Sequence, residues 1–115
     1  MHTELTIREA ARADVPAIVR MLADDHLGNQ REAYSDPLPE SYYHAFAEIE
    51  RDPNNTILVA CHGDVVVGTL QLTFIPSLSY QGGWRATVES VRTDATVRGQ
   101  GIGRMMTERA IELAR

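Results

Sequence analysis

The chain has 115 residues, which is enough for one domain with one hydrophobic core and too short for two. Its apolar share of 43% is that of an ordinary folded protein rather than a disordered one. From the length we expect one domain over residues 1–115. A net charge of −5 argues against a nucleic acid or an anionic membrane held by bulk charge, so we expect no nucleic-acid partner.

The first predicted elements are a strand and a helix. Residues 5–8 alternate apolar and polar side chains, as a half-buried strand does. Asp14 is typical of a helix N-cap, and Pro16 is tolerated in a first helical turn. The apolar residues that follow recur at helical spacing: Val15, Ile18, Val19 and Leu22. This spacing predicts an amphipathic helix.

A loop and a second helix are predicted next. Over residues 24–39 the periodicity is lost, and glycine, asparagine, serine and proline predict a loop. Residues 40–51 regain helical spacing through Tyr42, Phe46 and Ile49, and a following proline ends the helix.

Two further strands are predicted to form a hairpin. Residues 57–61 are rich in β-branched side chains, residues 62–64 are typical of a tight turn, and residues 65–74 form the returning strand. Gly68 inside the second strand predicts a bulge or a close approach of the backbone to another element.

A loop over residues 76–83 leads to a third strand of this meander, over residues 84–93. If the alternation along that strand is unbroken, Thr87, Glu89 and Val91 share one face.

The last predicted element is a helix that follows residues 94–97 and three glycines. Its apolar residues recur at helical spacing to the C-terminus: Ile102, Met105, Met106, Ala110 and Leu113. The order β-α-α-β-β-β-α predicts a mixed α/β domain with an antiparallel meander. Because a parallel strand usually covers such a helix, we expect a further segment beyond Arg115.

Cysteine usage and hydropathy bear on location. The lone Cys61 cannot form an intrachain disulfide, which fits a reducing cytosol. No apolar run reaches the ~18 residues of a membrane span, and residues 1–8 lack the apolar centre of a signal peptide. We therefore expect a cytoplasmic protein with no membrane partner.

Residues 98–104, Arg-Gly-Gln-Gly-Ile-Gly-Arg, open the last helix with glycines at alternate positions. A helix N-terminus binds phosphate because unpaired N–H groups and the positive end of the helix dipole converge there. The dinucleotide-binding spacing G-x-G-x-x-G fails at Arg104, and the P-loop spacing fails because the chain has no glycine–lysine pair. The stretch predicts a phosphate site of another kind; the alternative is a turn that only connects strand to helix.

The order Arg-x-x-Gly-x-Gly over residues 98–103, between a strand and an amphipathic helix, resembles motif A of the GCN5-related N-acetyltransferases. The order of elements resembles this family over essentially the whole chain. The resemblance implies direct transfer of an acetyl group from acetyl-CoA to a primary amine of a small molecule. It also implies that the acetyl-CoA pyrophosphate is bound by this loop: Arg98, Gly99, Gln100, Gly101, Ile102, Gly103 and Arg104.

In the family, the end of the preceding strand pairs with the pantetheine arm, and one N–H polarises the acetyl carbonyl. The matching residues here are Val91, Arg92 and Thr93. Attack on a thioester builds an oxyanion that a preplaced N–H stabilises, which gives this arrangement a chemical reason. The alternative is an ordinary strand end.

Glu89 is the candidate general base, because an alkylammonium with a pKa of about 10.4 must lose a proton before it attacks. The family often carries a glutamate at this place on the strand. A carboxylate on a central strand is costly unless it is solvated or paired. The alternative is therefore a structural ion pair of Glu89 with Arg85 or Arg92. The tyrosine that usually serves as general acid has no match here and is expected beyond Arg115.

The amine acceptor is expected between the loop over residues 24–39, the loop over residues 76–83 and the strand that carries Glu89. Substrate-binding candidates lie in these segments: Tyr34, Tyr80 and Trp84. Acidic residues there offer a lining for a cationic amine: Asp25, Asp36 and Glu89. The histidines show no metal-ligand spacing, so no metal is expected.

Two other hypotheses remain open at this point. One is a non-catalytic acyl-CoA-binding or interaction module derived from the same fold. The other is a homodimer in which a second chain supplies the strand that covers the last helix.

Overall fold

The computed structural model describes residues 4–24 and 26–114. It contains a four-stranded antiparallel sheet in which each strand lies beside its neighbour in the sequence, in the order β1-β2-β3-β4. The strands are β1 (Leu5–Glu9), β2 (Asn55–His62), β3 (Val65–Pro76) and β4 (Trp84–Thr93). The predicted mixed α/β class and the antiparallel meander are confirmed.

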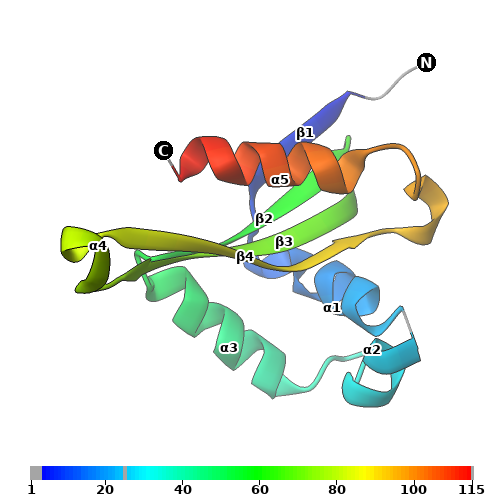
Figure 1. Cartoon of the computed structure of the whole chain (residues 1–115). Helices are drawn as coiled ribbons and strands as arrows, with labels where there is room; N and C mark the ends of the chain where they lie inside the picture. Colours follow the sequence, from blue (N-terminus) through cyan, green and yellow to red (C-terminus); the bar gives the residue numbers. More distant parts are fainter. Residues whose placement is uncertain (1–3, 25, 115) are drawn as a thin grey trace.

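Helices cover both faces of this sheet (Figure 1). Helix α5 (Ile102–Leu113) lies on one face, whereas α1 (Val15–Ala23), α2 (His26–Arg31) and α3 (Glu40–Arg51) lie on the other. No helix among the described residues is long and apolar enough to cross a membrane.

Two predicted loops contain short helices, which corrects the sequence prediction. Helix α2 has six residues with a glycine among them, too few to show an apolar repeat. Helix α4 (Ser79–Gly82) is a kinked turn in which Tyr80 and Gln81 have positive φ angles of 52° and 62°. Neither segment carries the periodic pattern from which a helix is predicted.

Asp14 lies at the start of α1 as predicted, but its carboxylate does not bond forward into the helix. It accepts a hydrogen bond from the Ala11 N–H at 2.7 Å and forms an ion pair with Arg8 at 2.8 Å. These contacts join the start of α1 to the end of β1.

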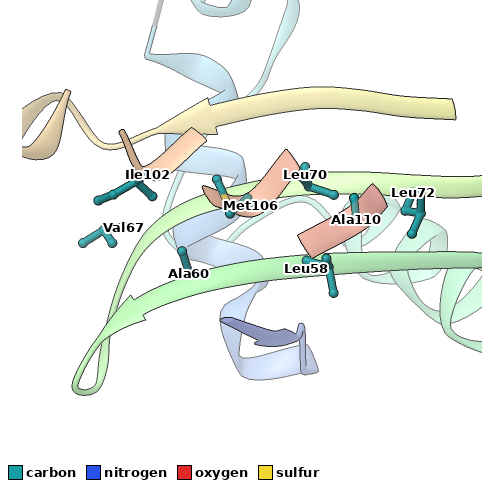
Figure 2. Packing of buried hydrophobic residues seen from close by; sticks show 8 residues of the cluster. All are labelled: Leu58, Ala60, Val67, Leu70, Leu72, Ile102, Met106 and Ala110. Carbon is teal, nitrogen blue, oxygen red and sulfur yellow. The ribbon is translucent and has the colours of Figure 1, made fainter. Parts of the chain in front are cut away.

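The core beneath α5 fixes that helix on the sheet (Figure 2). Its buried residues come from β2, β3 and α5: Leu58, Ala60, Val67, Leu70, Leu72, Ile102, Met106 and Ala110. Gly68 lets the helix approach closely, because a Cβ there would lie 2.7 Å from Cε of Met106 and 3.1 Å from Cγ2 of Ile102. The pairing of β2 with β3 also shifts beside Gly68. Both readings of this glycine are confirmed.

Strand β4 is interrupted by a second irregularity. Thr69 pairs with Arg92, but Gln71 pairs with Glu89, so β4 contains one more residue than β3 between these pairs. Ser90 there has a φ of 54°, which an L-residue rarely adopts.

This bulge breaks the alternation along β4. Glu89 remains on the face of Gln71, whereas Val91 packs against the core cluster beneath α5. The expectation that Thr87, Glu89 and Val91 share one face is therefore wrong, because the extra residue turns Val91 to the opposite face.

Candidate functional site

The glycine loop, residues 98–103, connects β4 to α5 through a 3-10 turn at Ala95–Val97. Gly99 and Gly101 have φ angles of 86° and 78°, a region that favours glycine. A Cβ on either of them would meet no atom within 4 Å, so the space above the loop is open. Positive φ, rather than crowding, is what requires glycine at these two positions.

The N-terminus of α5 begins at this open loop. Gly101 is its N-cap and supplies no side-chain hydrogen bond. The Met105 N–H donates to the Gly101 carbonyl at 3.0 Å, and the N–H groups before it in the first turn have no intrahelical acceptor. Donors and the positive end of the helix dipole are therefore directed to the open side of the loop.

Gly103 joins this first turn to the end of β4. A Cβ on Gly103 would lie 3.7 Å from Cγ1 of Val91 and 3.8 Å from Cγ2 of Thr93, which is ordinary contact. Val91, Thr93 and the first turn of α5 are thus neighbours. Within the described residues β4 pairs only with β3, so its other edge presents N–H and C=O groups without a strand partner.

Two arginines place positive charge beside the loop. The Arg98 side chain is 54% exposed, and its Nη2 lies 3.5 Å from Oδ2 of Asp24. The Arg104 Nε lies 3.1 Å from Oε1 of Glu108, one turn along α5. Both guanidinium groups are accessible to an anionic ligand. Arg92 differs, because its Nη1 donates to the Val91 carbonyl at 3.0 Å and the residue is half-buried.

Asp94 stabilises the turn that precedes the glycine loop. The sequence analysis did not identify this residue. Its Oδ1 accepts hydrogen bonds from the Thr96 N–H at 3.0 Å and the Thr96 hydroxyl at 2.8 Å. Its Oδ2 lies 2.9 Å from Nη2 of Arg20 on α1. The bonds from Thr96 and then the Arg20 guanidinium lower the pKa of Asp94 to about 2. The Asp-x-Thr spacing is a local signal for such a turn.

Glu89 lies just before the bulge in β4, in register with Gln71 and Ile57, on the face where Ile57 packs with residues of α1 and α3. Its cross-strand neighbour Gln71 donates to Oδ1 of Asn55 at 3.0 Å, so Glu89 adjoins a polar strip of the sheet. The residue is exposed, so solvent removes the cost of its charge. No ion pair joins Glu89 to Arg85 or Arg92 in the part of the chain that the structure describes.

The two loops expected to border the acceptor lie at opposite ends of the sheet (Figure 1). Helix α4 is at the tip of the β3–β4 hairpin, far from α2, because these strands extend beyond the body of the domain. Tyr80 and Trp84 are there, 93% and 61% exposed, and are not brought together with Tyr34. The prediction that both loops border a single acceptor cleft is therefore wrong.

Tyr34 instead lines a cavity of ≈ 480 Å³ beside the end of α1 and α2. The lining residues are Arg20, Ala23, Asp24, Asn29, Glu32, Ala33 and Tyr34. Asp24 and Glu32 provide its acidic groups. Asp36 is exposed and does not line this cavity, and Asp25 lies outside the described residues.

Tyr42 fixes one wall of this cavity, a role that its core-like spacing did not reveal. Its hydroxyl donates to Oε1 of Glu32 at 2.7 Å and accepts from the Ala33 N–H at 2.9 Å. Desolvation by burial raises the pKa of Tyr42, which remains protonated and can donate. Helix α3 thereby holds the segment that follows α2.

The described residues contain no group of three or more histidine, cysteine or acidic side chains that could hold a metal ion. Cys61 is buried in β2. The chemistry near the loop is that of backbone donors, arginines and carboxylates.

The chain matches one known protein family. Residues 19–115 match the sequence model of the acetyltransferase (GNAT) family. No curated protein matches the chain.

A structure from Bacillus halodurans C-125, named a transcriptional regulator, is 56% identical with a TM-score of 0.94, and the match covers 96% of this chain and 74% of that one. A protein of Agrobacterium tumefaciens whose name assigns it provisionally to the acetyltransferases is 28% identical with a TM-score of 0.81, over 95% of this chain and 72% of that one. A Clostridium acetobutylicum protein solved with acetyl-CoA shares the fold at 19% identity and a TM-score of 0.72, over 96% and 73%. The chain thus spans about three-quarters of the length of these structures.

Proposed function

The chain belongs to the acetyltransferase (GNAT) family, and on that premise we propose that it transfers the acetyl group of acetyl-CoA to a primary amine of a small molecule. The observation that carries this proposal is the glycine loop at the N-terminus of α5. Gly99 and Gly101 both have positive φ, Gly101 is also the N-cap of α5, and the space in front of both glycines is open, so a pyrophosphate fits there.

The loop residues fit that group by charge as well as by shape. Backbone N–H groups of residues 98–104 supply hydrogen bonds, and the guanidinium groups of Arg98 and Arg104 supply charge-assisted contacts. Gly103 supports the same proposal, because neither its φ nor its surroundings require a glycine inside a helix. A backbone without a side chain there permits a close approach of the ligand.

The end of β4 is proposed to hold the pantetheine arm. Val91, Arg92 and Thr93 follow the bulge and lead directly to the loop, and the outer edge of β4 presents main-chain groups. When bound, acetyl-CoA supplies the acetyl group as a thioester. An N–H of this segment would stabilise the oxyanion that forms on the acetyl oxygen.

Glu89 is proposed as the general base. It takes a proton from the ammonium, directly or through water, and the amine nitrogen then forms the bond to the acetyl carbon while the C–S bond breaks. The sulfur leaves as the thiolate of CoA. The exposed position of Glu89, without an ion-pair partner among the described residues, leaves its carboxylate available for this task.

The acceptor is proposed to bind on the α1–α2 side of the sheet, where Tyr34 and acidic side chains line the cavity of ≈ 480 Å³. Tyr80 and Trp84 do not belong to that proposal, since they lie at the tip of the β3–β4 hairpin. The cation in this account is a primary ammonium group.

A non-catalytic acyl-CoA-binding module is the second candidate. The observation that favours it is the 56% identical structure named a transcriptional regulator. Such a module would bind CoA through the same loop and consume no thioester in the presence of amines.

Titration calorimetry with CoA, together with chemical unfolding in its presence and absence, tests whether the glycine loop binds CoA. We expect saturable binding to the wild-type chain and a rise in its unfolding free energy of about 2.7 kcal/mol at a hundredfold excess over Kd. The absence of both effects would remove CoA from the account and, with it, both candidate functions.

A further inference from the structure

The end of α1 is joined to the segment between β4 and α5 by two ion pairs of unequal strength. Arg20 and Asp24 are four residues apart and therefore share a face of the chain at the end of this helix. Arg20 pairs with Asp94, and Asp24 pairs with Arg98. Both partners belong to the short segment between β4 and α5.

The Arg20–Asp94 pair is a fixed connection. Its N···O distance is 2.9 Å, the Asp94 side chain is only 13% exposed, and the same carboxylate accepts two hydrogen bonds from Thr96. The Asp94 N–H also donates to the Val67 carbonyl at 2.8 Å. Breaking this connection would leave a largely buried carboxylate without its cation.

The Asp24–Arg98 pair is much weaker. The Arg98 Nη2 lies 3.5 Å from Oδ2 and 3.4 Å from the main-chain oxygen of Asp24, both beyond the usual range for a strong hydrogen bond. Half of each side chain is exposed to solvent. Exposed pairs of this kind contribute little to stability, whereas a guanidinium binds a phosphate through shorter, charge-assisted bonds.

We propose that Asp24 and Arg98 form a latch that opens when acetyl-CoA binds. If the chain binds acetyl-CoA as proposed above, the pyrophosphate takes Arg98 from Asp24, while the Arg20–Asp94 pair keeps α1 attached to the segment that enters the loop. Asp24 also lines the acidic cavity with Glu32 and Tyr34. Once Arg98 has turned to the phosphate, the Asp24 carboxylate is free to bind a cation in that cavity.

The latch therefore makes the acceptor cavity more negative when the donor is bound. Arg20 also lines the cavity, but its guanidinium is paired with Asp94, so the departure of Arg98 leaves Asp24 without its cation. An alkylammonium binds better beside such a carboxylate than beside one paired with a guanidinium. By reciprocity the two ligands strengthen one another's binding. Asp24 is in this account the residue that couples the two substrates.

Calorimetric titration with CoA tests the exchange in five proteins: wild type, D24N, R98Q, D24N/R98Q and the control D64N. Asp64 is an exposed acidic residue in the β2–β3 turn, so D64N removes one negative charge away from the loop. D24N is expected to bind CoA about two- to fivefold more tightly, because Arg98 no longer has a competing partner. R98Q is expected to bind at least about tenfold more weakly.

The double variant decides the assignment. D24N is expected to change nothing in the R98Q background, since its effect acts through Arg98. An unchanged Kd in D24N alone, the same gain in R98Q, or an equal gain in D64N would overturn the latch while leaving CoA binding intact. Failure of the wild-type chain to bind CoA would overturn both the latch and the proposed function.

The cavity is tested with 1,4-diaminobutane as an alkylammonium probe, titrated with and without saturating CoA. The wild-type chain is expected to bind the probe more tightly with CoA, and D24N is expected to lose this difference. Equal affinity in the two states of the wild type, or no binding in both, would overturn the assignment of the cavity.

Discussion

The Nη2 atom of Arg20 lies 2.9 Å from Oδ2 of Asp94, which connects the last turn of α1 to the segment that enters the glycine loop. The two residues are far apart in the sequence, and they approach because α1 packs against β3 and β4. The loop is thus positioned from both faces of the sheet, by the core under α5 and by this ion pair.

Asp94 is predicted to hold the loop in its binding geometry. Asp94→Ala removes the turn with Thr96 as well as the ion pair, and should lower the unfolding free energy by about 1–2 kcal/mol. Asp94→Asn retains an acceptor for Thr96 and should cost less. Urea unfolding checks the order, and CoA titration should show a larger loss of affinity in the alanine variant. Equal stability of both variants would show that the turn contributes nothing.

The same carboxylate predicts a dependence of stability on pH. The folded state lowers the pKa of Asp94 from 3.8 to about 2, so its contribution is present above pH 3.8 and is lost as the pH falls through about 2. Unfolding free energy should therefore decline more steeply in the wild type than in Asp94→Asn over this window. Parallel curves from pH 4.5 to pH 2 would contradict the assignment. The wild type must be compared with Asp94→Asn because Arg8 lowers the pKa of Asp14, so Asp14 also makes stability depend on acidic pH in both proteins.

Gly101 and Gly103 are predicted to respond in opposite directions to the same substitution. Gly101→Ala places a Cβ at a φ of 78° and should destabilise the chain by about 1–2 kcal/mol while weakening CoA binding. Gly103→Ala should stabilise α5 by about 0.5–1 kcal/mol, because its Cβ would meet Val91 and Thr93 at ordinary distances. Thermal unfolding of the pair provides the measurement, and a shift of the same sign in both would refute this reading of the loop.

These two glycines also show which features can be predicted from sequence. The loop and α5 are local, since the alternate glycines and the apolar repeat lie within one stretch of chain. The strands of the meander and the close approach at Gly68 could be predicted from the sequence for the same reason. All of these predictions depend on residues close to one another in sequence.

The bulge at Ser90 and the partners of α1 could not be predicted in this way. A serine gives no sequence signal for a positive φ, so the bulge at Ser90 could not be predicted. The change of face between Glu89 and Val91 could therefore not be predicted either. The contact of Arg20 with Asp94 depends on packing between elements far apart in the sequence. The separation of Tyr34 from Tyr80 likewise follows from the length and direction of the β3–β4 hairpin.

Glu89 is predicted to act in the chemical step and not in binding of the donor. Glu89→Gln should lower kcat by about 10²- to 10⁴-fold while leaving the Kd for CoA unchanged. Asp64→Asn is the charge-matched control and should retain the wild-type kcat. A kcat in Glu89→Gln equal to that of the wild type would remove Glu89 from the mechanism.

The most direct measurement of the central claim follows CoA thiol release from acetyl-CoA in the presence of a panel of small primary amines, with the acetylated product identified by mass spectrometry. We predict that at least one amine accelerates thiol release by the wild-type chain, that an equal amount of acetylated amine forms, and that Gly101→Ala and Glu89→Gln reduce the rate. CoA binding without release of thiol for any amine would contradict the transferase account and favour the binding module.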